Sequence, residues 1–430
     1  MKGYSQALEP LFNRGFFPYD IQMKGIDWMM KRHYCILGDE PGVGKTIQAT
    51  AVMALSGGRS ICVVPSSLKV NWKNEIEKYC NLKVKIITNG RAASNVCWGE
   101  HDVIIVSYSL LGKFRREVLL EADNYIFDEA HYLCNIEAQR TQVTHEIIEK
   151  YVPNRVLLLS GTPVKNRVGE YFSLLALCSY NNRGTSGVDI SIDYPSLYKF
   201  QDTFSWKEEY RIGRRKITKF EGTRNVPLLK TLLRGKYKRR TLDQVAEIPP
   251  QQHIDVDVDT KEIDEELYQD FLDGNGHVST SKAKTALAKA KDTIQYARNL
   301  LQTTDAVIIF TDHVASATAI HEGLSGSVLI TGSVPTKKRA EYVERFQNGK
   351  LDIIVATIGS ASVGFTLTRS KDIIFNDLAW VEADNEQARR RIYRVSQTEK
   401  TRIHYILGSK MDKMIKKTLA RKIANLKEIV

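Results

Sequence analysis

Residues 34–46 read YCILGDEPGVGKT. This stretch restricts the possible fold classes of the chain more than any other. The four residues at its start are apolar on both faces, which is typical of a buried parallel strand. Glycines at 42 and 44 let consecutive backbone N–H groups curl around an anion. A helical pattern follows, and it would point the positive end of its dipole at the same place. The stretch therefore predicts a phosphate-binding loop made by Gly42, Gly44, Lys45 and Thr46.

In such a loop Lys45 would reach the β- and γ-phosphates of a nucleotide, and the Thr46 hydroxyl would ligate Mg²⁺. The strict pattern has glycine five places before Gly44, where this chain has Asp39. The alternative is a glycine-rich turn that happens to precede Lys-Thr. The strand before the turn and the helix after it favour the phosphate loop.

An acidic pair follows a second buried-type strand. Tyr125–Phe127 leads directly into Asp128 and Glu129, and the carboxyl end of a parallel strand is where such folds bind nucleotides. Asp128 would hold Mg²⁺, and Glu129 would orient and deprotonate the attacking water. The alternative is an ordinary surface pair of acids. The next strand ends in Ser160-Gly161-Thr162-Pro163, small polar residues that would sense the phosphate.

Short apolar runs alternate with helical patterns in two separate regions. This predicts an α/β fold of two lobes, each a parallel sheet flanked by helices. We expect lobe one at residues 1–177, a helical basic insertion and linker at 178–250, and lobe two at 251–430. The strands expected for the two lobes are Tyr34–Leu37, Ile61–Val64, Val84–Thr88, Val103–Val106, Tyr125–Phe127 and Val156–Leu159, then Ala306–Phe310, Val328–Ile330, Ile353–Ala356, Asp372–Phe375 and Ile403–Leu407.

The bulk composition indicates a protein that stays where it is made. The start of the chain lacks the apolar stretch of a secretory signal, and no apolar run approaches the roughly 20 residues that span a bilayer. The six cysteines show no C-x-x-C pair, which disfavours a zinc site or a disulfide framework. We expect a cytoplasmic protein of a bacterium or virus-infected cell, or a nuclear protein.

The formal net charge is +12, and two segments concentrate it, at about 207–240 and 389–422. Such a charge fits a polyanionic partner, but each basic run also fits a solvated helix face.

The order of these motifs resembles that of the Swi/Snf-type ATPases of helicase superfamily two. That family's phosphate loop typically reads D-E-x-G-x-G-K-T, as Asp39–Thr46 does, so the departure from the strict loop matches the family. The resemblance implies two RecA-like lobes with ATP between them. It also implies that Gln22, in the segment Pro18–Gln22, contacts the adenine base. The stretch that includes Arg239 and Arg240 is similar to the family's basic joining segment.

The second lobe carries the family's last motif. Gln387, Arg391, Arg394 and Gln397 fit its pattern Q-A-x-x-R-x-H-R-x-G-Q, although Tyr393 replaces the usual His and Ser396 the usual Gly. The resemblance implies that Gln387 belongs to the catalytic set and that Arg391 and Arg394 act as arginine fingers on the γ-phosphate. The alternative is a basic surface helix.

DNA contacts implied by the resemblance would be mostly to phosphates, since a translocating motor cannot depend on sequence. Trp380 matches a family aromatic, although Val381-Glu382 replaces the Asn-Pro that usually follows. Trp72 fits either a DNA contact or a core aromatic. The expected DNA-binding residues are Ser66, Ser67, Lys69, Thr331, Gly332, Thr357 and Trp380.

The resemblance implies an ATP- and Mg²⁺-dependent translocase on duplex or branched DNA, closest to the compact branch of annealing and fork-remodelling enzymes. A monomeric motor working beside replication or recombination proteins fits this interpretation. Two alternatives stay open: a helicase that separates strands of DNA or RNA, and a non-catalytic nucleic-acid-binding scaffold.

Overall fold

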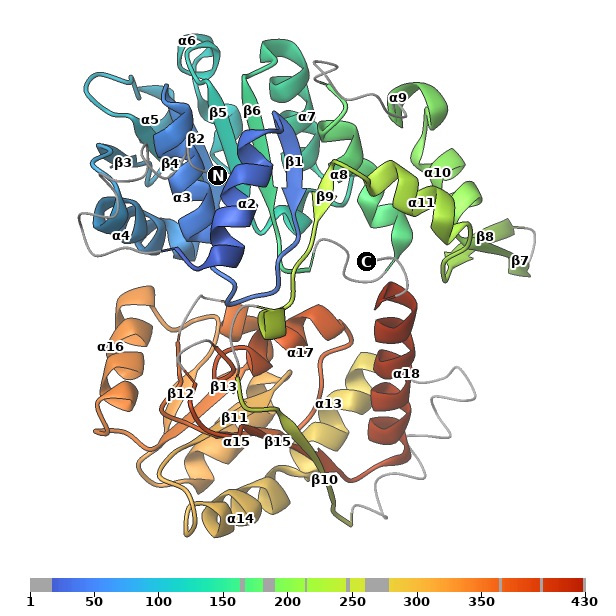
Figure 1. Cartoon of the computed structure of the whole chain (residues 1–430). Helices are drawn as coiled ribbons and strands as arrows, with labels where there is room; N and C mark the ends of the chain where they lie inside the picture. The colour runs from blue at the N-terminus through green and yellow to red at the C-terminus, as the bar shows by residue number, and fades with distance from the viewer. Residues whose placement is uncertain are drawn as a thin grey trace. The chain divides into compact units, whose positions relative to one another are not determined.

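The computed structural model describes residues 18–162, 167–180, 190–212, 215–244, 248–259, 278–362, 366–394 and 397–427. The chain divides into two compact units. Unit 1 comprises residues 1–245 with 425–430, and unit 2 comprises residues 246–424. Each unit contains its own sheet and its own hydrophobic core (Figure 1).

Unit 1 is built on a seven-stranded sheet in the order β3-β4-β2-β5-β6-β1-β9, in which every pairing is parallel. The central strands are buried on both faces, as their continuous apolar sequences predict. Two apolar clusters cover the opposite faces of this sheet. The strands are β1 (Tyr34–Leu37), β2 (Ser60–Val64), β3 (Val84–Ile86), β4 (Val103–Ser107), β5 (Asn124–Asp128), β6 (Arg155–Leu159) and β9 (Tyr237–Lys238).

Helices connect these strands, as parallel pairing requires. The first helix, α2, precedes β1, and α3 follows directly from the phosphate loop. The helices of this part are α2 (Asp20–Met30), α3 (Lys45–Ser56), α4 (Lys69–Tyr79), α5 (Gly90–Ser94), α6 (Arg116–Leu120), α7 (Gln139–Tyr151) and α8 (Tyr171–Leu177).

The basic region between the expected lobes is only partly helical. It contains α9 (Ile190–Asp193), α10 (Leu197–Phe204) and α11 (Val226–Leu233). It also contains an antiparallel hairpin of β7 (Trp206–Ile212) and β8 (Arg215–Glu221), which the sequence did not lead us to expect. The charged residues of the hairpin resemble a solvated helix face more than a buried strand. The hairpin could therefore not be predicted from its sequence pattern. The region ends in β9, which joins the sheet beside β1.

Unit 2 is built on a six-stranded sheet in the order β10-β15-β14-β11-β13-β12, again all parallel. Its strands are β10 (Gln252–Asp257), β11 (Val307–Thr311), β12 (Val328–Ile330), β13 (Ile353–Thr357), β14 (Asp372–Phe375) and β15 (Arg402–Leu407). Its helices are α13 (Val278–Ala288), α14 (Ala290–Leu300), α15 (Val314–Gly323), α16 (Thr336–Gln347), α17 (Glu382–Arg389) and α18 (Lys410–Lys427).

Two parallel sheets flanked by helices confirm the predicted fold class. The division at 177 and 250 stays a prediction. Within the described residues, no helix combines the length and the apolar character needed to cross a membrane.

Candidate functional site

The candidate site of unit 1 lies where three neighbouring strands end. β5, β6 and β1 are adjacent and parallel, so their carboxyl ends meet at one edge of the sheet. Asp128 ends β5, Ser160 follows β6, and the glycine-rich loop follows β1. Three motifs that are far apart in the sequence therefore converge at this edge, where α/β folds bind their ligands.

The loop has the backbone that its glycines predict. Gly42 has φ +95° and Gly44 has φ +88°, a left-handed region that other residues rarely adopt. Gly44 precedes α3, and no side chain caps the start of that helix. The Lys45 ammonium donates to the carbonyls of Asp39 (2.6 Å) and Glu40 (3.2 Å). Burial lowers the pKa of Lys45, while Glu129, Asp39 and Asp128 favour its charged form.

Gln22 lies against this loop from α2. Its side-chain amide donates to the Val43 carbonyl (3.0 Å), and its Oε1 accepts from the backbone N–H of Tyr19 (3.1 Å). A Cβ at Gly44 would collide with the Gln22 amide nitrogen. Gln22 is therefore held beside the loop, a position consistent with its predicted contact to the base.

The acidic pair is fixed by two aromatic side chains. Trp72 donates from Nε1 to Asp128 Oδ2 (2.7 Å), and the Tyr108 hydroxyl donates to the Asp128 carbonyl (2.7 Å). Burial, and after it the Glu129 carboxylate, raises the pKa of Asp128, against the opposing effects of Trp72 and Lys45. Trp72 is fully buried, so of its two predicted roles the structure favours the core aromatic.

Glu129 follows with φ +52°, an uncommon conformation for a non-glycine residue. Its Oε2 lies 3.2 Å from His131 Nδ1, which in turn lies 3.3 Å from the Ser160 hydroxyl. The acidic motif after β5 is thus connected to the polar residues after β6. Pro163, the last residue of that predicted motif, lies outside the described residues.

A buried ion pair explains the departure at Asp39. Arg240 donates from Nε to Asp39 Oδ1 (2.9 Å) and forms an ion pair with Asp39 Oδ2. Gln48 of α3 completes the group, since its Oε1 accepts from Arg240 (2.7 Å) and its amide donates to Asp39 Oδ2 (3.2 Å). A Cβ at Gly25 would collide with Gln48 and Arg240. Asp39 therefore ties the phosphate loop to the chain segment that follows β9.

Arg239 holds the same loop by different contacts. Its Nη1 donates to the Gly161 carbonyl (3.0 Å) and lies 3.4 Å from the Gly38 carbonyl, and its Nη2 lies 3.4 Å from Glu40 Oε1. Two consecutive arginines after β9 thus hold the loop through separate partners. Sequence reasoning placed them only in a joining segment, because nothing local shows that this segment pairs with β1.

The group is suited to a nucleoside triphosphate with a divalent cation. The loop offers backbone N–H groups and Lys45, which match phosphate oxygens. Asp128 and Glu129 are neighbouring carboxylates, and their repulsion contributes to the raised pKa of Asp128. A bound cation would relieve this repulsion. Thr46 begins the same helix as Lys45, and its hydroxyl is the type of oxygen ligand that Mg²⁺ accepts.

In unit 2, the predicted motif of Gln387, Arg391 and Arg394 lies in and just after α17. Gln387 and Arg391 are buried, and the Arg391 carbonyl accepts from the Leu367 N–H (2.9 Å). Arg394 Nε donates to the Arg390 carbonyl (3.3 Å), and burial lowers the pKa of its guanidinium.

Three other residues of this stretch have contacts within unit 2. Arg389 and Arg390 form ion pairs with Glu386 (2.7 and 2.6 Å), so their charges are used within the helix. Gln397 donates to the carbonyls of Thr368 (3.2 Å) and Ile392 (3.2 Å), which indicates a structural role.

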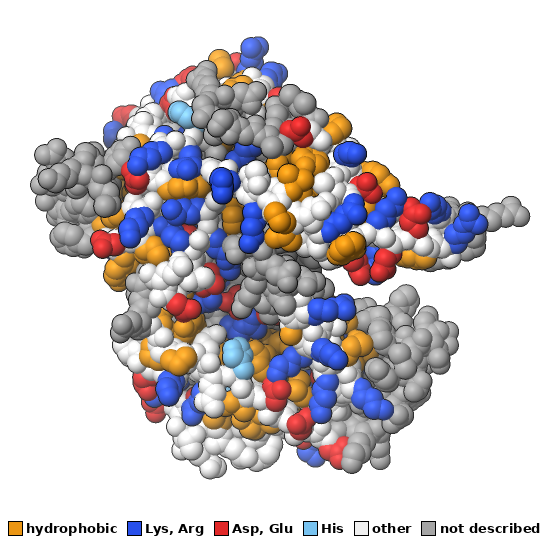
Figure 2. Space-filling view, turned by 45° about the vertical axis from the view of Figure 1, so that its right-hand side comes forward, with side chains coloured by type: hydrophobic (Ala, Val, Ile, Leu, Met, Phe, Trp, Pro, Cys, Tyr) orange, Lys and Arg blue, Asp and Glu red, His pale blue; other side chains and the backbone are white. Residues whose placement is uncertain are grey.

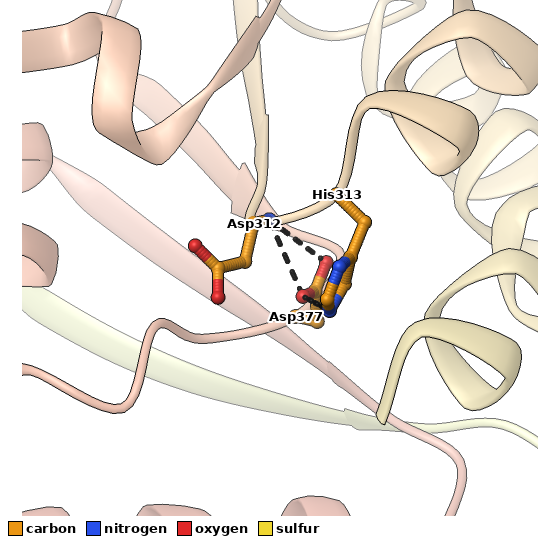
Figure 3. Close-up of side chains that lie close together, drawn as sticks. All are labelled: Asp312, His313 and Asp377. Atoms are coloured by element: carbon orange, nitrogen blue, oxygen red, sulfur yellow. Dashed lines mark hydrogen bonds and ion pairs between the residues drawn. The ribbon is translucent and has the colours of Figure 1, made fainter. Parts of the chain in front are cut away.

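The carboxyl edge of the second sheet carries a charged group of its own (Figure 3). Asp377 accepts from the backbone N–H of Asp312 (3.2 Å), and His313 Nε2 lies 3.8 Å from Asp377 Oδ2. The three side chains could surround a cation. Lys282, however, forms an ion pair with Asp312 and lies 3.8 Å from Asp377, so a cation is already present.

The predicted DNA-binding residues differ in exposure. Ser66 and Gly332 are exposed, Ser67 and Trp380 are half-buried, and Thr331 and Thr357 are buried. Lys69 is buried, and its ammonium donates to the Ile87 carbonyl (2.8 Å). The geometry therefore disfavours Lys69 as a phosphate contact, because its charge is held inside the fold.

Comparisons with known proteins match both units. The SNF2-related domain matches residues 21–306, and the helicase conserved C-terminal domain matches residues 289–396. The DNA annealing helicase and endonuclease ZRANB3 of Bos taurus is 28% identical over 424 residues, covering 90% of this chain and 38% of that protein.

A second relative is the SWI/SNF-related matrix-associated actin-dependent regulator of chromatin subfamily A-like protein 1 of Xenopus tropicalis. It is 25% identical over 419 residues, covering 90% of this chain and 42% of that protein. The chain thus spans about two fifths of the length of these curated relatives. The solved Sulfolobus solfataricus SWI2/SNF2 ATPase core in complex with dsDNA is 20% identical, with a TM-score of 0.44 and coverage of 96% and 93% of the two chains.

Proposed function

Because this chain belongs to the SNF2-related domain family, we propose that it is an ATP-hydrolysing motor that moves along duplex or branched DNA. Fork remodelling, branch migration and annealing are the reactions that such a motor performs on branched DNA. The relatives named as DNA annealing helicases support this choice. Replication or recombination proteins as partners, and a cytoplasmic or nuclear site of action, stay predictions.

One observation carries the proposal more than any other. The phosphate loop, the acidic pair and the Ser160 motif meet at the ends of β1, β5 and β6, and a buried ion pair between Asp39 and Arg240 fixes the loop in place. A scaffold without catalysis would not require Lys45 and both carboxylates at this one edge. The arrangement therefore favours hydrolysis over binding alone.

The residues of unit 1 divide the chemical work. Lys45 and the loop N–H groups would bind the phosphates, and Gln22 would bind the base. Glu129 would accept a proton from the attacking water. Thr46 and Asp128 would hold Mg²⁺, which supplies charge neutralisation to the phosphate oxygens.

Arg391 and Arg394 of unit 2, with Gln387 beside them, would complete the site. Guanidinium groups stabilise the charge that develops on the transferred phosphoryl group, and one such group is worth roughly 10³–10⁵ in rate. If these arginines come from the other unit, hydrolysis needs the two units to close around ATP. Closing and opening would then move one DNA-binding unit relative to the other.

DNA would be held mainly through its phosphates. Exposed positions after β2 and β12, at Ser66 and Gly332, are the best placed of the predicted contacts. Small residues and backbone N–H groups suit this task, because they bind phosphate without selecting a sequence.

An ATPase titration with different polymers tests the proposal. We expect duplex, forked and four-way junction DNA to stimulate ATP hydrolysis well above single-stranded DNA or RNA, and Glu129→Gln to abolish the stimulated rate. Equal stimulation by every polymer would favour the strand-separating helicase. A Lys45→Ala variant that acts on DNA as well as the wild type would favour the alternative of a non-catalytic nucleic-acid-binding scaffold.

A further inference from the structure

The hairpin of β7 and β8 carries solvent-exposed aromatic side chains in a basic part of unit 1. Trp206 is 60% exposed and Tyr210 is 44% exposed, whereas most aromatic residues of the described chain are buried or half-buried. The two strands pair only with each other among the described residues, so the hairpin stands apart from the main sheet (Figure 1). Exposed aromatics of this size usually mark a binding surface.

Trp206 and Tyr210 lie on the same face of the hairpin. They are four residues apart on β7, and strand side chains alternate between faces. Ile217 is the cross-strand partner of Tyr210 and extends this apolar strip. The opposite face is covered instead: Phe220 is buried, and its ring lies 5.4 Å from that of Tyr198. One face of the hairpin thus packs on the protein and the other is left open.

Trp206 is held in position before any ligand arrives. Gly222 has φ +62°, and a Cβ there would lie 3.1 Å from the indole Cδ1. The Arg224 guanidinium lies 5.9 Å from the indole ring centre, and its Nε donates to the Thr203 carbonyl (3.2 Å). A fixed aromatic ring loses little conformational entropy when another ring stacks on it.

The hairpin segment as a whole is basic, which favours a polyanion as its partner. Residues 206–224 contain seven Lys or Arg and three Glu. On the face opposite Trp206, Glu209 bridges Lys207 (2.9 Å) and Lys216 (2.6 Å). On the Trp206 face, which also carries Glu208, Glu221 binds Lys219 (2.7 Å). Figure 2 shows Lys and Arg side chains mixed with hydrophobic and acidic ones over the projecting part of unit 1. Seven basic and three acidic residues leave the segment with a net charge of +4, which argues for nucleic acid over an apolar protein partner.

We propose that the Trp206–Tyr210 face of the hairpin stacks unpaired nucleobases of branched DNA. Aromatic rings with basic neighbours bind single strands in this way, because every base offers a π-face and the cations meet the backbone. Paired bases inside a duplex are stacked on each other and cannot use this face. The inference rests on the proposed action on branched DNA, and it names the part of the substrate that the hairpin contacts.

Binding of two labelled DNAs by the full chain tests the inference. One is a blunt duplex, and the other is the same duplex with two unpaired thymidine arms. We expect Trp206→Ala with Tyr210→Ala to weaken binding of the forked DNA about ten-fold and to change binding of the blunt duplex less than about two-fold. Trp206→Phe should restore most of the forked-DNA affinity, because a ring remains.

Leu120→Ala is the matched control, since Leu120 is an exposed apolar residue (61%) elsewhere in unit 1. It should leave both affinities unchanged. Duplex-stimulated ATP hydrolysis of each variant checks the fold. An equal loss on both DNAs, or no loss on the forked DNA, would overturn the inference, and the second result would assign the face to a protein. If wild-type hydrolysis responds to no DNA at all, the proposed motor function itself fails.

Discussion

The two sheets of this chain have the same architecture, but the charges at their carboxyl edges are arranged differently. In unit 1, Asp128 and Glu129 lie next to each other, and burial with mutual repulsion raises the pKa of Asp128. In unit 2, Asp312 and Asp377 share the ammonium of Lys282. The first edge is suited to accept a cation and a nucleotide, whereas at the second edge the Lys282 ammonium already lies between the two carboxylates. The same fold therefore holds its edge carboxylates in two different ways.

The contribution of unit 2 to hydrolysis gives the largest expected effect. We expect Arg391→Ala to lower kcat for DNA-stimulated ATP hydrolysis by about 10³-fold, because a transition-state cation is lost. The dissociation constant for ATP should change only a few-fold, because binding relies on unit 1. Steady-state kinetics and nucleotide binding on the same preparation measure both. Arg402→Ala, which removes an arginine bonded to Asp372 (2.6 Å), serves as the control and should keep kcat within a few-fold.

The Asp39–Arg240 pair should give the next largest effect, on stability. Arg240→Ala leaves the fully buried Asp39 carboxylate without its cation, which costs about 3–5 kcal/mol of unfolding free energy. Urea unfolding measures the loss, and the Michaelis constant for ATP should rise because the loop loses its anchor. Arg239→Ala is the matched comparison. Its partner Glu40 is partly exposed and lies 3.4 Å away, so a loss as large as that of Arg240→Ala would contradict the account.

Two buried groups, one in each unit, should respond to acid over different pH ranges. Burial lowers the pKa of His145 in unit 1 to about 4, and its ring contacts the Ser173 (2.9 Å) and Tyr180 (3.0 Å) hydroxyls. A depressed histidine pKa means that the folded state prefers neutral His145. This stability is present above pH 6.5 and is lost as the pH falls toward 4. By itself, His145 should lower the unfolding free energy by about 2 kcal/mol between pH 7 and 5, while Asp128, whose pKa is raised, changes it in the opposite direction.

Unit 2 contains a group that responds only to stronger acid. Burial alone would raise the pKa of Asp372, but hydrogen bonds from His404 (2.9 Å) and Arg402 (2.6 Å) lower it to about 2. The stability from this group is present above about pH 4 and is lost toward pH 2. Urea unfolding of the wild type and of His145→Gln at pH 7 and 5 isolates the His145 contribution, and the wild type should lose about 2 kcal/mol more than the variant. Equal losses in the two proteins would contradict the assignment.

The smallest expected effect concerns Lys69. Each Lys or Arg that neutralises a DNA phosphate adds about one to the slope of log affinity against log salt. Because the Lys69 ammonium is held by the Ile87 carbonyl, we expect Lys69→Ala to leave this slope almost unchanged. A slope reduced by about one would show that Lys69 does contact DNA, as the sequence predicted.

Much of the fold and the motif set of unit 1 could be predicted because the carboxyl ends of adjacent parallel strands meet at one edge of a sheet. Apolar runs such as Tyr34–Leu37 and Val156–Leu159 gave the strands, and adjacency of β1, β5 and β6 brought their motifs together. Arg239 and Arg240 were missed as loop contacts, because the two-residue strand β9 has no sequence pattern of its own. The hairpin at Trp206 was missed because its charges resemble a helix surface. The burial of Lys69 depends on a distant carbonyl that no local pattern reveals.

In the proposed cycle, ATP brings the two units together. Inter-unit energy transfer tests this directly, with dyes at Leu120→Cys in unit 1 and Leu287→Cys in unit 2, both exposed positions, in a chain whose exposed Cys97 is replaced by Ser. With DNA present, we predict one transfer efficiency for a non-hydrolysable ATP analogue and another for ADP, and no nucleotide response in Lys45→Ala. An efficiency that stays constant through all nucleotide states, while the labelled protein still hydrolyses ATP, would contradict the account.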